Sequence, residues 1–199
     1  MIHGMTDWLP LLAFAVASSV TPGPNVLMVA AAAAGHGVRA VLPHMLGITA
    51  GFGAMLLLVG LGLAGPLLAS SLLHGTLRWV GAAWLLWLAW KIATAPPPRQ
   101  GEARPPLGFI GAALFQWVNP KAWMIAAAAI PAFTRPGEAL VPQVLAIALV
   151  FVLVSMPCLM LWAGLGAWAG RFLANAARLR AFNIAMALLL VASLVPMLG

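Results

Sequence analysis

The sequence is poor in charge and poorest in acid, with three Asp and Glu residues among 199 and charged residues making up only 7% of the chain. A soluble domain carries roughly a quarter of its residues as charged side chains. This chain is instead 64% hydrophobic, with a mean hydropathy of +1.05. The composition excludes an ordinary soluble domain and predicts an all-α integral membrane protein, because lipid is the solvent that an apolar helical surface requires.

Other absences narrow the functional classes. The single cysteine, Cys158, excludes an internal disulfide, a CxxC redox pair and a cysteine zinc site. The four histidines show no metal-ligand spacing, and the apolar segments hold neither a nucleophile with its base nor metal-binding carboxylates. We therefore expect no enzyme activity, no metal and no cofactor. The net charge of +7 is spread without a Lys/Arg run, so we expect no nucleic-acid partner.

Six apolar segments predict about six transmembrane helices in a single transporter domain, residues 1–199. A proline-rich loop, residues 96–106, joins the halves 1–95 and 107–199. Three helices per half make the second half enter the membrane from the opposite side, which is the geometry of the 3+3 inverted repeat of secondary transporters. The segments are Trp8–Ala34, Ala40–Ala64, Leu67–Ala93, Leu107–Ile130, Leu140–Trp168 and Phe182–Leu198.

The basic residues concentrate in alternate loops and predict the topology. The first, third and fifth loops hold most of them, so the positive-inside rule puts these loops in the cytoplasm and both termini outside. The residues in or beside these loops are Arg39, Lys91, Arg99, Arg104, Arg171, Arg178 and Arg180.

The first helix is predicted to break within the run Thr21-Pro22-Gly23-Pro24-Asn25. Both prolines lack an N–H and clash with the preceding turn, and glycine adds backbone freedom. The carbonyls that the break releases need polar partners, which lipid does not offer. The new half-helix would begin near Pro24 and turn its positive dipole end toward a polar cavity suited to a carboxylate. A kink used only for packing is the alternative reading.

The fourth helix repeats this pattern at Asn119-Pro120-Lys121, 98 positions after the first polar-Pro pair. Asn119 is placed to cap a half-helix that starts at Pro120, and Gln116 lies one turn earlier. A basic residue in mid-membrane costs about 2.5–3.5 kcal/mol on insertion scales. We therefore expect the Lys121 ammonium to reach freed carbonyls, a substrate carboxylate or the first break. Snorkelling of the side chain to the interface is the alternative.

Three further features have both a functional and a packing interpretation. His44 lies early in the second predicted span and is a candidate for proton coupling, although a packed or interfacial histidine is commoner. The pairs Gly47/Gly51 and Gly166/Gly170 permit close helix contact within the fold or between subunits. The tryptophans of the third segment, such as Trp79 and Trp90, are expected to face lipid or the interface.

Taken together, the runs Thr21–Asn25 and Asn119–Ala122 resemble the paired signatures of the LysE/RhtB family of amino-acid exporters. The third helix, residues 77–91, and the Gly-rich second helix around Gly47 and Gly51 are also similar to that family's. The resemblance covers essentially the whole chain. It implies a proton-motive-force-driven secondary exporter of amino acids or close derivatives in the bacterial cytoplasmic membrane.

One departure from the family pattern bears on the substrate. Many relatives carry an acidic residue just after the glycine of the second helix, whereas this chain has Gly51-Phe52. No acid falls within a predicted span, which leans against a cationic substrate. The expected partners are an amino acid or analogue and membrane lipid, and a homodimer is compatible with so small a carrier. A membrane scaffold or assembly factor without a substrate is the alternative function.

Overall fold

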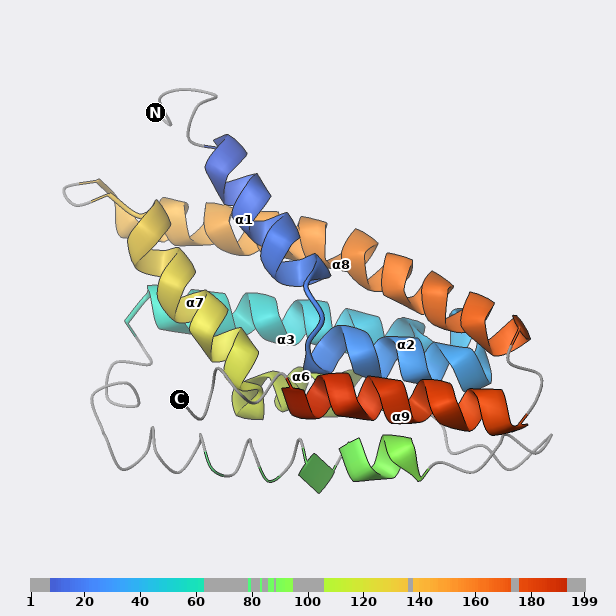
Figure 1. Cartoon of the computed structure of the whole chain (residues 1–199). Coiled ribbons are helices and arrows are strands. Elements are labelled where there is room, and N and C mark those ends of the chain that lie inside the picture. Colours follow the sequence, from blue (N-terminus) through green and yellow to red (C-terminus); the bar gives the residue numbers. More distant parts are fainter. Residues whose placement is uncertain are drawn as a thin grey trace.

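A computed structural model of the chain describes residues 8–62, 106–135, 138–172 and 176–192, together with positions 79, 83, 86, 87 and 89–94. Every regular element in these ranges is helical, which confirms the predicted all-α fold for this part of the chain. The helices lie lengthwise beside one another, with α8 passing along the bundle and α1 and α7 inclined at one end (Figure 1).

The first predicted segment is two helices rather than one. Helix α1 spans Trp8–Val20 and helix α2 spans Pro24–His36, and their axes differ by 51°. Helix α2 begins at Pro24, where a missing N–H costs nothing because the first turn of a helix has no intrahelical acceptor for it. The predicted break and its position are therefore confirmed.

The fourth predicted segment is broken in the same way. Helix α6 spans Phe109–Phe115, the 3₁₀ turn η2 spans Gln116–Val118, and helix α7 spans Pro120–Phe133. Asn119 stands between η2 and α7 in an extended conformation, so a second half-helix starts at a proline. Both breaks thus have the same construction, although the sequences around them differ.

The remaining described helices are less interrupted. The 3₁₀ turn η1, Arg39–Val41, leads into α3, Leu42–Gly60, and helix α8 spans Leu140–Phe172 with Pro157 inside it. Helix α9 spans Ala176–Ala192. At 1.5 Å per residue, the 33 residues of α8 extend about 50 Å, more than the roughly 30 Å of a bilayer's hydrocarbon core.

Each long helix packs against both segments of the other half's broken helix. Helix α3 contacts α6 and α7, and helix α8 contacts α1 and α2. The two breaks lie close together, since side chains next to the second break bond to residues of the first.

Two glycine seams make the closest of these contacts. A Cβ on Gly47 would overlap with the carbonyl oxygen of Phe109, and one on Gly51 would lie 2.6 Å from the backbone of Ala113, so α3 meets α6 backbone to backbone. The second seam has the same form, because a Cβ on Gly166 would overlap with the carbonyl oxygen of Ala30 on α2. Both glycine pairs therefore serve packing within the fold.

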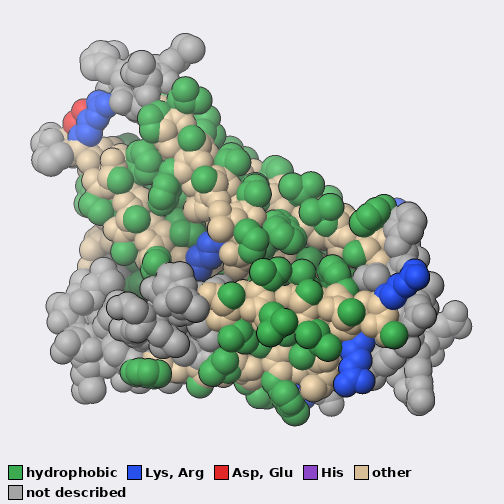
Figure 2. All heavy atoms as spheres, in the orientation of Figure 1, with side chains coloured by type: hydrophobic (Ala, Val, Ile, Leu, Met, Phe, Trp, Pro, Cys, Tyr) green, Lys and Arg blue, Asp and Glu red, His purple; other side chains and the backbone are tan. Residues whose placement is uncertain are grey.

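Large apolar side chains cover the outside of the bundle. Exposed examples lie on α1, α6, α8 and α9, and include Leu9, Ile110, Leu153, Trp168 and Leu188. Figure 2 shows apolar side chains over most of the visible face, with Lys and Arg gathered mainly near the ends of the molecule. Trp79, Trp87 and Trp90 are also exposed, in agreement with the predicted lipid-facing or interfacial role. This surface suits contact with lipid rather than water.

The described residues account for only part of the six predicted transmembrane spans. Two of their helices, Arg39–Gly60 and Leu140–Gly170, are long and apolar enough to cross a membrane alone, and the bent pair α1 and α2 makes a third if it counts as one span. Two shorter apolar helices, Phe109–Val118 and Arg180–Leu189, lie among the others. Six spans and the inverted repeat stay predictions, since most of the segment Leu67–Ala93 lies outside the described residues.

Candidate functional site

The first break releases backbone carbonyls that distant side chains then bind. Pro24 lacks the N–H that a continuous helix would direct at the carbonyl of Val20, and the indole Nε1 of Trp162 on α8 donates to that oxygen instead, at 3.1 Å. The carbonyl of Thr21 accepts a hydrogen bond from the Nζ of Lys121 on α7, at 2.6 Å. The cost of breaking the helix is thus offset by donors from both α7 and α8.

The second break satisfies its own backbone in a parallel way. The Oδ1 of Asn119 accepts the backbone N–H of Lys121 at 3.1 Å, which is the predicted N-cap of α7. The Nε1 of Trp123 donates to the carbonyl of Trp117 at 2.9 Å. An indole N–H therefore caps a released carbonyl at each break.

A pair of side-chain amides joins the two breaks directly. The Nδ2 of Asn25 donates to the Oε1 of Gln116 at 2.8 Å, and the Nε2 of Gln116 donates back to the Oδ1 of Asn25 at 3.2 Å. The same Nε2 also donates to the carbonyl of Ala112 at 2.9 Å. Gln116 is fully buried, so this network is shielded from competition by water and fixes α2 against η2.

The Lys121 side chain reaches the first break by passing across Gly23. A Cβ at Gly23 would lie 2.7 Å from the Cδ and 3.0 Å from the Nζ of Lys121. The predicted contact between the lysine and the freed carbonyls is therefore present, and it depends on the absence of a side chain at Gly23. The bond from an ammonium to a carbonyl is charge-assisted and stronger than a neutral one.

These residues surround a small cavity, which we call the Lys121 cavity. It measures about 50 Å³. This is far below the roughly 300–1,000 Å³ of small-molecule sites, so in this state the cavity has no room for an amino acid. The lining residues are Ser18, Ser19, Gly23, Asn25, Val26, Ile48, Phe52, Asn119, Lys121, Ala122, Ile125, Ser155 and Leu159.

The lining combines donors for an anion with neutral oxygens. The first N–H groups of α2, at Asn25 and Val26, have no acceptor within the helix, and Gly23 provides no side-chain cap. They add the positive end of the helix dipole to the charge of the Lys121 ammonium. Serine hydroxyl groups and the side-chain amides of Asn25 and Asn119 make up the rest of the polar lining, and no carboxylate is among the described lining residues. The cavity therefore favours a carboxylate at the breaks and lacks a counter-charge for a second cation.

The structure brings most of the predicted site residues together. Four of them line the Lys121 cavity: Gly23, Asn25, Asn119 and Lys121. The other predicted residues of the two breaks support these four through the backbone or through a side-chain amide hydrogen bond. The residues in this supporting set are Thr21, Pro22, Pro24, Gln116 and Pro120.

His44 lies apart from this group. His44 belongs to α3, and its side chain is buried but does not line the Lys121 cavity. Both ring nitrogens lack a hydrogen-bond partner among the described residues. Its assignment to proton coupling stays a prediction.

Several site residues were missed by sequence reasoning. Ser155 on α8 lines the cavity, and its Oγ donates to the Oγ1 of Thr49 at 3.3 Å, which links α8 to α3. Trp162 caps the first break from the same helix. Ser18 and Ser19 directly precede the break, and this position was a signal that could have identified them. The residues on α8 carry no such signal, because only the packing brings them to the site.

Comparison with known proteins supports one family over most of the chain. The family model for the LysE type translocator matches residues 16–194. A cysteine/O-acetylserine efflux protein of Salmonella typhimurium (strain LT2) is 33% identical over 181 residues, covering 89% of this chain and 90% of the relative. The protein of the same name from Escherichia coli (strain K12) is 30% identical over 179 residues, with the same coverage. No solved structure matches the chain.

Proposed function

Because this chain belongs to the LysE type translocator family, we propose that it is a secondary exporter of small neutral amino acids or close derivatives. Family membership and the named efflux relatives make it a membrane protein of amino-acid efflux. The solute, the driving force and the site residues belong to our proposal. We place the protein in the bacterial cytoplasmic membrane with both termini outside.

The proposal rests on one observation, which is that the Lys121 ammonium of one half binds the Thr21 carbonyl in the break of the other half. In the absence of a solute this carbonyl is the hydrogen-bond partner of the half-buried ammonium. A solute carboxylate is a better partner for the ammonium, because it is itself charged. The N-terminal N–H groups of α2 would then bind the second carboxylate oxygen.

The chemistry of the cavity favours a neutral zwitterion. The hydroxyl groups of Ser18, Ser19 and Ser155 offer acceptors for the solute's α-ammonium group. A lysine or arginine would bring a second cation that has no carboxylate to meet it among the described lining residues. Cysteine and O-acetylserine, the solutes in the relatives' names, are small, and their side chains add no charge to the zwitterion. We propose solutes of this class.

Transport requires the Lys121 cavity to open, since about 50 Å³ is too little space for such a solute. We propose alternating access by motion of the two halves, 1–95 and 107–199, as an inverted repeat with six spans. The reciprocal packing of α3 on α6 and α7, and of α8 on α1 and α2, supports this arrangement. A homodimer is compatible with it.

We propose the proton motive force as the driving force, with His44 as the candidate coupling residue. Its imidazole is buried within α3 and has no hydrogen-bond partner among the described residues, so a proton could change its interactions. A His44→Gln variant should then export with a weakened response to uncouplers. An unchanged response would remove His44 from the mechanism and leave the carboxylate site standing.

The test is the release of labelled solute from cells that carry the protein and from matched cells that lack it. We expect faster loss of O-acetylserine and cysteine, no change for lysine, and slowing by an uncoupler. Equal loss of every solute from both kinds of cell would favour the alternative, a scaffold or assembly factor without a substrate. Faster loss of lysine would contradict the proposed preference for neutral solutes.

A further inference from the structure

A second and larger pocket lies at the end of the bundle where the N-terminal end of α1, the C-terminal end of α7 and the start of α8 meet. It measures about 270 Å³, close to the lower limit of about 300 Å³ for small-molecule sites. We call it the Arg135 pocket. Its lining residues are Trp8, Pro10, Leu11, Ala132, Phe133, Thr134, Arg135, Glu138, Gln143, Ala146 and Ile147.

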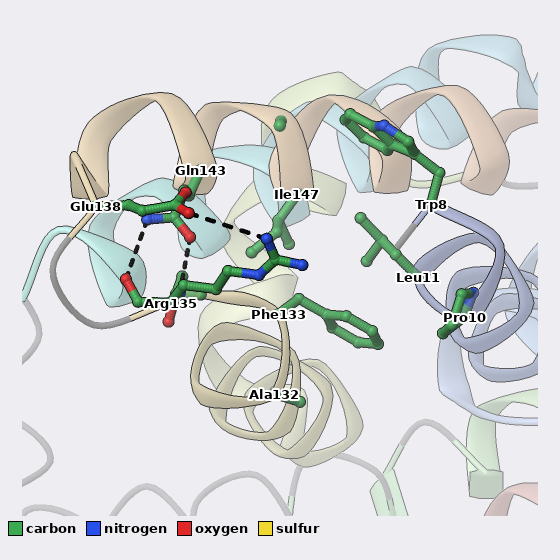
Figure 3. Close-up of a pocket in the computed structure, with 11 residues that line it drawn as sticks. Trp8, Pro10, Leu11, Ala132, Phe133, Arg135, Glu138, Gln143 and Ile147 are labelled. Atoms are coloured by element: carbon green, nitrogen blue, oxygen red, sulfur yellow. Dashed lines mark hydrogen bonds and ion pairs between the residues drawn. The ribbon is translucent and has the colours of Figure 1, made fainter. Parts of the chain in front are cut away.

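The pocket combines a charge of each sign with an apolar wall. An Nη1 of Arg135 lies 3.9 Å from an Oε1 of Glu138, and both side chains are about half exposed. Figure 3 shows the Arg135 guanidinium extending over Phe133 and Ile147, with Trp8 and Leu11 of α1 on the opposite side. Arg135 and Glu138 pair with each other, so a zwitterion would bind by replacing this contact, with its carboxylate on the guanidinium and its ammonium on the Glu138 carboxylate, while the apolar wall suits a small side chain.

Hydrogen bonds from Gln143 hold the charged segment in place. The backbone N–H of Arg135 donates to the Oε1 of Gln143 at 2.7 Å (Figure 3). The Nε2 of Gln143 donates to the carbonyl of Ala139 at 3.2 Å. The same Nε2 lies 3.4 Å from the carbonyl of Arg135. Arg135 is therefore anchored through its backbone to the first turn of α8.

The same three helices line both the Arg135 pocket and the Lys121 cavity. Along α1 the lining residues pass from Leu11 to Ser18, and along α8 they pass from Ile147 to Ser155. These steps of seven and eight residues correspond to about 10–12 Å along a helix. On α7 the lining runs in the opposite chain direction, from Phe133 to Ile125. The two spaces therefore lie in line.

Four aromatic rings connect the two spaces. Phe133 lines the Arg135 pocket and its ring centroid lies 5.8 Å from that of Phe14. Phe14 contacts Phe151 at 6.2 Å, and Phe151 contacts Phe52 at 5.4 Å. Phe52 in turn lines the Lys121 cavity. A continuous row of rings, with Phe151 fully buried in it, thus runs from the pocket to the cavity.

We propose that the Arg135 pocket is a second binding site for the exported amino acid, and that the Phe14, Phe133, Phe151 and Phe52 rings form the gate between it and the Lys121 cavity. This rests on the proposed exporter function. In the topology that we propose, the loop carrying Arg135 lies outside, so the pocket is the exit site from which the solute leaves. Phenylalanine rings suit a gate because a rotation of one side chain opens space without breaking hydrogen bonds.

The binding site is tested by protection of introduced cysteines in a Cys158→Ala background. Ala146→Cys reports on the Arg135 pocket and Ser155→Cys on the Lys121 cavity. Purified protein in detergent is labelled with a maleimide, with and without O-acetylserine. We expect O-acetylserine to slow labelling at position 146 both in the parent and in Lys121→Met. With Arg135→Gln this protection should weaken about tenfold, which corresponds to a loss of about 1.4 kcal/mol of binding free energy.

Three results would overturn the second site: no protection at position 146, protection that Arg135→Gln leaves unchanged, or protection by phosphatidylethanolamine but not by O-acetylserine. The last would identify a lipid headgroup site, since that headgroup also pairs an ammonium with an anion. The proposed exporter function is judged separately by release of solute from the parent, so it can stand when the second site fails.

The gate is tested with Phe14→Ala, which removes the ring that contacts both Phe133 and Phe151. We expect labelling of Ser155→Cys to accelerate about tenfold, while labelling of Ala146→Cys stays the same. The matched control is Phe109→Ala, a loss of the same ring from the exposed face of α6. Equal labelling of Ser155→Cys in the parent and in Phe14→Ala, with both folded by melting temperature, would overturn the gate.

Discussion

The helix breaks and the glycine seams both bring the two halves of the chain into contact, but the seams use backbone contacts and the breaks use side-chain contacts. At the seams, Gly47 and Gly166 meet the backbone of another helix. At the breaks, Gly23 meets the flexible end of the Lys121 side chain. The seams therefore fix the scaffold, whereas the breaks hold a charged group that can move away from its partner. The difference separates the residues that stabilise the fold from those that we propose to bind the solute.

The seams also divide each broken helix into a fixed and a less fixed segment. Gly47 holds α6 against α3, Gly166 holds α2 against α8, and the Asn25–Gln116 amide pair joins these two fixed segments. The other segments, α1 and α7, line both the Lys121 cavity and the Arg135 pocket. We therefore expect the opening motion to occur in α1 and α7.

The largest expected effect is at a seam. Gly166→Ala places a methyl group against the backbone of α2, where neither side can give way, and should destabilise the protein by about 3 kcal/mol. For a chain of this size that corresponds to a melting temperature about 6–12 °C lower. Gly164→Ala on the same helix is the control, because a Cβ there meets nothing within 4 Å. Equal melting temperatures for the two variants in detergent would refute the seam.

A glycine at the break should behave in the opposite manner. Gly23→Ala displaces the Lys121 ammonium from the Thr21 carbonyl, and the flexible side chain moves at little cost to stability. Because the methyl group moves the ammonium away from the first break, where we propose that it binds the solute carboxylate, a charge-assisted bond worth about 1.5–3 kcal/mol is lost and efflux should slow at least about tenfold. The control is Gly35→Ala in α2, where a Cβ is unobstructed. If Gly23→Ala lowers the melting temperature as much as Gly166→Ala does, the contrast between the regions is wrong.

The amide pair gives the smallest effect. Asn25→Ala leaves the buried Gln116 amide, and Gln116→Ala the half-buried Asn25 amide, without its partner across the breaks, and each should cost about 1–3 kcal/mol. The double variant should cost less than the sum, because the second removal takes away a group that is already unpaired. A thermal double-mutant cycle in detergent measures this coupling. Strict additivity would show that the pair does not join the breaks.

The sequence was most informative where the covalent chemistry restricts the backbone. Proline at positions 22, 24 and 120 predicts both breaks, and Asn119 predicts the cap of α7, because these effects act within a few residues. The same reasoning proposed that Lys121 contacts the first break, since a buried ammonium needs a nearby oxygen. The predicted site is thus recovered where local rules or a large energetic cost applied.

The contacts that complete the site depend on packing across the chain. Trp162 caps Val20 from 142 positions away, and Ser155 reaches the cavity because α8 packs between α1 and α3. Nothing in the local sequence distinguishes these residues from others of α8. The helix boundaries differ for a similar reason, because α9 begins at Ala176 rather than at the predicted Phe182.

The transport of O-acetylserine by purified Lys121→Met protein in liposomes tests the central claim most directly. Methionine keeps the unbranched shape and most of the length of the side chain and removes the charge. The control is Lys91→Met, at a lysine outside the cavity that lies over the rings of Trp87 and Trp90. We predict that the efflux rate of Lys121→Met is about a hundredfold or more below that of the parent, while its melting temperature shows that it is folded. Lys91→Met should transport like the parent. Transport by Lys121→Met at the parental rate would contradict the proposal that the ammonium at the first break binds the solute.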